Sequence, residues 1–406
     1  MKIAINELLY AVSTALDHVE AHFIGVTTYH AQRVAYLSAL TGKALGLESD
    51  ELFFLATAAL LHDNALFQFF ADAEDWNKMK LTEKEMEQHC IEGEENVKGL
   101  PFYPQIKHAI LYHHERADGK GVFGKKTDET PLFARLIHFA DTLDTAFNVR
   151  EVSEEKYHKL LQYVQKECDS CYDRECAEAF CQAISYEALS RIAGDNIRLV
   201  LEDTIPPREW DITSDELMQF SDIFARIIDV KSQFTSKHSI GIAQKAYKMA
   251  AEYYNWEQDI AQKLYFAGAL HDIGKLMVKS DILEKPGRLT ADEYTEIQNH
   301  AMGTYRILSS VTGLEDITNW ASLHHEKLDG SGYPFGKDAS ELGKEERLMA
   351  CLDIYQALVE DRPYKSGMPH LKAIGILKEM ADKGQLDAEI VADMDTYFDR
   401  RQEVSD

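Results

Sequence analysis

The chain has 406 residues, of which 45% are hydrophobic and 28% are charged, a composition typical of a globular protein rather than a disordered one. Its length exceeds what one hydrophobic core usually fills, so two domains of about 200 residues each are expected. The formal net charge of −26 disfavours duplex nucleic acid and acidic membrane surfaces as partners, and no apolar run is long enough to span a bilayer. The chain starts without a basic, apolar leader and has few cysteines, so we expect a cytoplasmic protein.

Apolar residues recur with the period of an α-helix along most of the chain. The segments that show this period best are residues 29–47, 51–67, 135–147, 259–274 and 347–361. The cysteine-rich segment 166–181 contains no Gly or Pro and is also expected to be helical. The sequence therefore predicts an all-α protein of two helical bundles in tandem. The domains are residues 1–206 and 207–406, with Pro206-Pro207 as the linker.

One pattern of histidines and aspartates occurs twice, in the same order and with spacings that agree within two residues. The first copy comprises His30, His62, Asp63, His89, His113, His114 and Asp141, and the second comprises His238, His271, Asp272, His300, His324, His325 and Asp353. A single histidine of this kind is more often a hydrogen-bonded core residue than a ligand. Seven ligand-type residues repeated in order favour metal binding, and they exceed the needs of one ion. The pattern predicts two homologous metal-binding domains.

At these residues the second copy resembles the HD-GYP family within the HD superfamily of metal-dependent phosphohydrolases. The motifs that carry the resemblance are LHDIGKL, the lone His300, HHEKLDGSGYP and DRPYK. The resemblance implies that one metal ion is bound by His238, His271, Asp272 and Asp353, with Asp272 as the bridging carboxylate, and the other by His300, His324 and His325. Phe234 stands where some members have a glutamate for a third metal, so a binuclear site is expected. Iron or manganese is favoured, with zinc and nickel as alternatives.

The resemblance also implies the substrate contacts. Lys275 matches the lysine that contacts the substrate phosphate or the bridging solvent, and Arg362 and Lys365 match basic positions that hold phosphates. Tyr333 either stacks on a base or packs against a neighbouring helix.

The loop that contains Tyr333 leaves further alternatives open. Glu326 and Asp329 either orient ligating histidines or form a turn. Gly330 and Gly332 are expected to adopt positive backbone angles.

The first copy matches the family only in part. It keeps every candidate ligand, but Leu66 stands where the second copy has Lys275. Val122 and Phe123 replace the Tyr-Pro pair, and DRPYK has no counterpart. We expect a domain that can hold metal and whose role is structural, regulatory or weakly catalytic, in that order.

The leading functional hypothesis is a phosphodiesterase for a cyclic dinucleotide, most of all cyclic di-GMP, with catalysis at Asp272 and Lys275 of the second domain. The alternatives are hydrolysis of cyclic GMP-AMP or another phosphoester, di-iron oxygenation, and a metal-stabilised protein that binds cyclic dinucleotides as a scaffold for signalling partners. The sequence leaves open whether the chain forms a homodimer.

Overall fold

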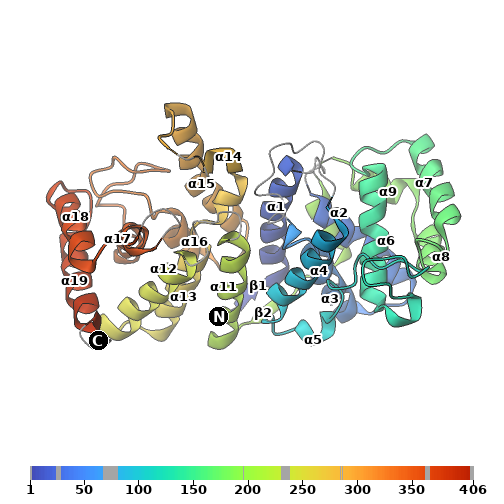
Figure 1. The fold of residues 1–406 in the computed structure, drawn as a ribbon, viewed down its shortest axis with the longest axis horizontal. Coiled ribbons are helices and arrows are strands. Elements are labelled where there is room, and N and C mark those ends of the chain that lie inside the picture. Colours follow the sequence, from blue (N-terminus) through green and yellow to red (C-terminus); the bar gives the residue numbers. More distant parts are fainter. Residues whose placement is uncertain are drawn as a thin grey trace. The chain divides into compact units, whose positions relative to one another are not determined.

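The structure, a computed structural model, describes residues 2–23, 29–66, 81–194, 196–229, 238–283, 285, 287–361 and 366–402. The chain forms two compact units: Ala4–Trp210, here the N-terminal unit, and Asp211–Asp406 with Met1–Ile3, here the C-terminal unit. The division thus falls a few residues after the predicted Pro206-Pro207 linker. Helices make up most of the described residues (Figure 1), and the predicted all-α fold is confirmed.

The helices of the N-terminal unit are α1 (Ile5–Phe23), α2 (His30–Ala44), α3 (Ser49–Leu60), α4 (Glu83–Val97), α5 (Tyr103–Ile106), η3 (Thr127–Glu129), α6 (Leu132–Phe147), α7 (Glu154–Glu167), α8 (Arg174–Ala183), α9 (Tyr186–Arg191) and α10 (Ile197–Thr204). Of these, α2, α3 and α6 fall within the predicted periodic segments 29–47, 51–67 and 135–147 or overlap them, and further helices lie between and after them. Two short strands, β1 (Lys2–Ala4) and β2 (Glu209–Asp211), pair as a two-stranded sheet.

The C-terminal unit repeats the helical order of the N-terminal one. Its helices are α11 (Ser214–Asp229), α12 (His238–Lys248), η4 (Met249–Tyr253), α13 (Gln258–Leu270), η5 (Ile273–Met277), α14 (Ser280–Leu283), α15 (Ala291–Leu308), α16 (Glu315–Ser322), α17 (Lys344–Val359), α18 (His370–Asp382) and α19 (Ala388–Gln402). In each unit the helix that starts with the first histidine packs, among others, against two helices that correspond between the units. These are α3 and α6 for α2, and α13 and α17 for α12. The repeat in sequence is thus a repeat in packing.

The helices that carry the lone histidines begin at strong capping sequences. Before α4 the Thr82 hydroxyl accepts the backbone N–H of Glu85, and the Glu85 carboxylate accepts that of Thr82. Thr290 and Glu293 make the same pair of hydrogen bonds before α15. Such reciprocal caps satisfy N–H groups that the helix itself leaves unpaired, so they fix where each helix starts.

The cysteine-rich segment departs from its predicted helix. Helix α7 ends at Glu167, Asp169 has a positive φ of 63°, and α8 begins at Arg174. The Asp173 side chain accepts the backbone N–H of Cys176 and starts the new helix. The prediction of one continuous helix was wrong because local turn chemistry outweighed the absence of Gly and Pro.

Among the described residues, no helix has both the length and the apolar character needed to span a membrane.

Candidate metal centres

The seven predicted ligands of the C-terminal unit come from five elements and lie together. His238 begins α12, His271 and Asp272 link α13 to η5, His300 lies in α15, and Asp353 lies in α17; His324 and His325 follow α16. Their ligand atoms form overlapping groups within 4.8 Å, namely His300 with His324 and His325, His271 with Asp272 and His324, and His238 with His271 and Asp353. All except His325 are buried. Residues up to 115 positions apart therefore form one cluster.

Backbone carbonyls determine which nitrogen three of the five histidine rings present to the cluster. The Nδ1 atoms of His271, His300 and His324 lie 2.8, 2.6 and 2.6 Å from carbonyl oxygens three residues earlier in the chain. A carbonyl can only accept, so Nδ1 carries the proton and Nε2 keeps its lone pair. This is the arrangement that metal-binding histidines usually show.

The Nε2 atoms, which keep their lone pairs, are placed to bind a cation. The Nε2 atoms of His300 and His324 are 3.3 Å apart, so two lone pairs face each other. Nε2 of His271 is buried and has no hydrogen-bond partner. Burial lowers the pKa of His300 to about 3 and that of His324 well below its ordinary value, which keeps both rings neutral. A divalent ion would satisfy these groups together.

Two carboxylates complete the cluster. Asp272 places Oδ2 3.1 Å from His271 Nε2 and Oδ1 3.5 Å from His300 Nε2, so it lies between two histidines as a bridging ligand would. Burial opposes its ionisation, yet His271 and Lys275 hold its pKa well below the ordinary value. Asp353 lies 3.2 Å from His238 Nε2.

Lys275 lies at the cluster as the family motif implies. It follows Asp272 by three residues in η5, and its ammonium group forms an ion pair with that carboxylate. About a fifth of the side chain is exposed, so the cation borders both the buried carboxylate and solvent.

Sequence reasoning missed Glu360. Its Oε2 accepts a hydrogen bond from Nδ1 of His238 at 3.0 Å, where His271, His300 and His324 use a carbonyl. This bond and that to Asp353 outweigh burial and raise the pKa of His238 to about 9. Glu360 follows Asp353 by seven residues, two helical turns, and that spacing was the available signal.

The loop after His325 packs directly on this ligand. The Tyr333 ring lies 4.7 Å, centroid to centroid, from the His325 ring. A Cβ added to Gly332 would lie 2.5 Å from the Cα of Glu326, so only glycine lets the loop approach. Gly330 has the expected positive φ, 74°, but Gly332 does not. The expectation for Gly332 was therefore wrong, because close backbone contact and not φ requires glycine there.

Glu326 shapes this loop and does not orient a histidine. Its carboxylate accepts backbone N–H groups of Phe335, Gly336 and Lys337 at 2.7 to 3.1 Å. Asp329 accepts from Ser331 within a turn. Of the two interpretations, the turn is the one observed. The predicted phosphate contacts Arg362 and Lys365, and Phe234, lie outside the described residues.

The N-terminal unit builds a second cluster on the same plan. Asp63 lies between His62 Nε2, at 3.2 Å, and His89 Nε2, at 3.1 Å, and Asp141 lies 3.2 Å from His30 Nε2. The Nδ1 atoms of His62 and His113 again face carbonyls three residues earlier. His114 lies 3.9 Å from the other Asp141 oxygen.

The residues around the N-terminal cluster differ from those around the C-terminal cluster at two places. Leu66 is buried where Lys275 stands in the other unit. The partner of His30 Nδ1 is Asp144, which also forms a bidentate pair with the fully buried Arg33. Sequence reasoning missed this pair, whose members are 111 residues apart.

A cavity of about 430 Å³ adjoins the N-terminal cluster. His114 and His138 line it together with two cationic side chains, Arg116 and Lys120. Arg116 forms a bidentate ion pair with Asp118, so its charge is largely matched by that carboxylate.

Comparison with protein-family models matches the HD domain at residues 16–176 and again at 222–390. The chain belongs to the HD domain family. The resemblance drawn from the motifs is thus confirmed, and with it the class of metal-dependent phosphohydrolases. Both matched regions contain a complete cluster, so this HD domain protein carries two copies in tandem.

Relatives of this HD domain protein include enzymes of Vibrio cholerae. The 3′3′-cGAMP-specific phosphodiesterase 1 is 28% identical, covering 96% of this chain and 90% of that protein. The 3′3′-cGAMP-specific phosphodiesterase 3 is 27% identical over 92% and 90%. A cyclic di-GMP phosphodiesterase of Pseudomonas aeruginosa is 32% identical over 37% of each chain. The crystal structure of a cyclic GMP-AMP-specific phosphodiesterase of V. cholerae has the same fold, with a TM-score of 0.67, 24% identity and 98% coverage of both chains.

Proposed function

We propose that this HD domain protein is a phosphodiesterase that hydrolyses a cyclic dinucleotide at the cluster of the C-terminal unit. The observation that carries the proposal is the position of Lys275. This cationic, partly exposed side chain pairs with Asp272 at the edge of the seven candidate metal ligands, a place that suits the binding of a phosphate. Di-iron oxygenation has no need of this lysine.

The residues at the C-terminal cluster have different roles in the proposed hydrolysis. Two divalent ions held by the seven ligands would supply hydroxide at neutral pH and positive charge for the phosphoryl oxygens. Lys275 adds a further positive charge for the transition state, and Asp272 keeps that ammonium in place. Tyr333 packs against the His325 ring and so restricts its orientation. Arg362 and Lys365 are proposed to hold the substrate's other phosphate.

We propose 3′3′-cyclic GMP-AMP as the first substrate to test, ahead of cyclic di-GMP. The relatives that match along nearly the whole chain carry that name, whereas the cyclic di-GMP phosphodiesterase of P. aeruginosa matches over about a third. The tandem arrangement, and not only the C-terminal motifs, therefore supports the choice.

The test compares hydrolysis of both cyclic dinucleotides by the full chain loaded with manganese or ferrous iron. His271→Ala/Asp272→Ala is expected to lower the rate more than about a hundredfold, because it removes a ligand and the bridging carboxylate. His62→Ala/Asp63→Ala is the matched control in the N-terminal unit and should retain turnover. Binding of either dinucleotide without turnover under both metals would contradict the proposal and favour a scaffold role.

A further inference from the structure

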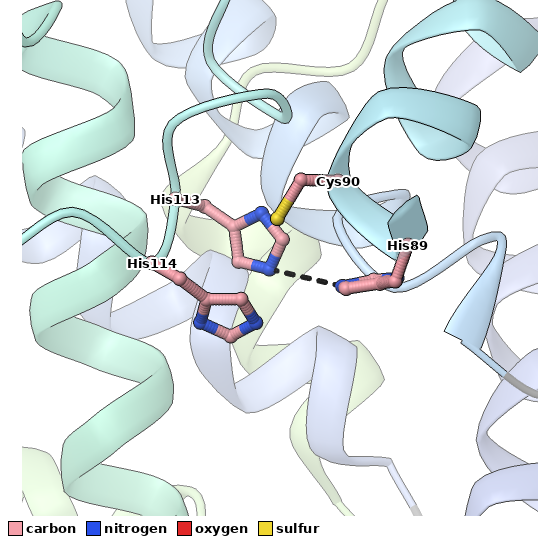
Figure 2. Close-up of side chains that lie close together, drawn as sticks. All are labelled: His89, Cys90, His113 and His114. Atoms are coloured by element: carbon pink, nitrogen blue, oxygen red, sulfur yellow. Dashed lines mark hydrogen bonds between the residues drawn. The ribbon is translucent and has the colours of Figure 1, made fainter. Parts of the chain in front are cut away.

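The N-terminal cluster contains a sulfur atom that the C-terminal cluster lacks. Cys90 follows His89 in α4, and its Sγ and one nitrogen each of His89, His113 and His114 all lie within 4.8 Å of one another. Figure 2 shows the sulfur beside the His113 ring, with His89 and His114 around the same space. The corresponding residue of the C-terminal unit, after His300, is Ala301. The thiol is thus a difference between two otherwise matching centres.

The buried polar atoms around this sulfur are not all paired in hydrogen bonds. Cys90 is fully buried and forms no disulfide. Oδ1 of Asp63 lies 3.1 Å from His89 Nε2 and 3.5 Å from His113 Nε2, yet it accepts no aligned hydrogen bond. Leu66 supplies no charge where Lys275 pairs with the equivalent aspartate. Buried polar atoms left in this state are costly unless a cation binds among them.

We infer that the N-terminal unit binds one zinc-type ion through the thiolate of Cys90 together with His89, His113 and His114. On binding, the S–H bond of Cys90 breaks, its proton passes to solvent, and the sulfur lone pair is donated to the ion. No electron is transferred to or from the protein. Thiolate ligands favour zinc over the harder ions that imidazole and carboxylate accept.

The consequence is a division of labour between the two units. Three imidazoles and a thiolate fill a tetrahedral shell and leave no position for a reacting water, as in structural zinc sites. The N-terminal centre therefore stabilises its unit and does not hydrolyse substrate. This inference concerns the other unit and stands apart from the proposed phosphodiesterase activity.

The test uses cobalt(II), which reports its ligands by absorption. The full chain is stripped of metal and reconstituted with cobalt. We expect a thiolate-to-cobalt charge-transfer band in the near ultraviolet from one cysteine per chain. Cys90→Ala, which copies Ala301, should remove this band and weaken binding at the N-terminal centre at least about tenfold. Cys351→Ala, in the C-terminal unit, is the control and should leave the band unchanged.

A cobalt protein without the thiolate band, or a band that persists in Cys90→Ala, would overturn the inference. If Cys90→Ala fails to fold, X-ray absorption of the zinc-loaded His271→Ala/Asp272→Ala variant decides the question. One sulfur at about 2.3 Å from zinc supports the inference, and a shell of nitrogen and oxygen alone contradicts it. Turnover by the wild-type chain, measured separately, tests only the proposed function.

Discussion

At the scale of single residues, Lys275 is the charged side chain that distinguishes the C-terminal centre from the N-terminal one. Both clusters hold an aspartate between histidines, but among the described residues only the C-terminal aspartate pairs with an ammonium group. Leu66 at the matching place is buried and apolar. The two units thus share an arrangement of candidate cation ligands and differ in the charge beside it.

Lys275→Leu, which copies the N-terminal unit, is expected to lower kcat for cyclic dinucleotide hydrolysis about a hundredfold, because a transition-state charge loses its partner. The metal content should stay unchanged, since Lys275 is not a ligand. Steady-state kinetics and metal analysis of the same preparation check both points. Lys378→Leu is the control, because it removes a lysine of α18 that pairs with Asp395 of α19. Equal loss in the two variants, or loss of metal in the first, would contradict this role.

Asp387 illustrates how contacts between elements hold the site in position. It precedes α19, and its Oδ1 accepts the backbone N–H groups of Glu389 and Ile390 at 3.0 and 3.3 Å. Its Oδ2 lies 2.9 Å from Arg347 in α17, the helix that carries Asp353. One carboxylate thus caps one helix and ties it to the helix of a candidate ligand.

The same carboxylate predicts a pH dependence of stability. Burial of Asp387 opposes ionisation, but hydrogen bonds from Arg347 and the backbone outweigh it and lower its pKa below 3.8. Its contribution is therefore present above about pH 4 and is lost as the pH falls through the folded-state pKa.

Asp387→Asn should lower the unfolding free energy at pH 7 by about 1–2 kcal/mol, because the ion pair with Arg347 is lost. The difference from wild type should shrink on acidification below about pH 4. Urea titrations of the full chain between pH 7 and 3 measure it. A difference that stays constant across this range would contradict the assignment.

The sequence predicted contacts well where they depend on local periodicity. Five helical segments and the seven-residue cluster of each unit followed from spacing, because a period of 3.6 and a repeated order are visible along the chain. Glu360 and the Arg33–Asp144 pair were missed because their contacts depend on packing between distant segments. The break at Asp169 was missed because a single residue with positive φ has no periodic signature.

At the scale of the whole molecule, the chain consists of two units that each enclose a complete set of candidate ligands. None of these ligands is shared between the units. Metal binding at one centre therefore needs no residue of the other.

Metal analysis of the full chain should accordingly show two additive losses. His89→Ala/Cys90→Ala and His271→Ala/Asp272→Ala are each expected to remove part of the bound metal, and the combined variant should lose the sum, because separate sites usually behave additively. Equilibrium dialysis followed by elemental analysis measures the stoichiometry. Complete loss of metal in either double variant would show that the centres depend on each other.

The carbonyl contacts of the histidine Nδ1 atoms have a consequence for how such a duplicated chain can diverge. Main-chain atoms, which no substitution removes, orient His62 and His113 as they orient His271 and His324. Mutations around the rings can thus exchange a lysine for a leucine, or an alanine for a cysteine, and the imidazoles still point into the cluster. A duplicated domain can in this way change the charge beside its histidines while the histidines keep their orientation.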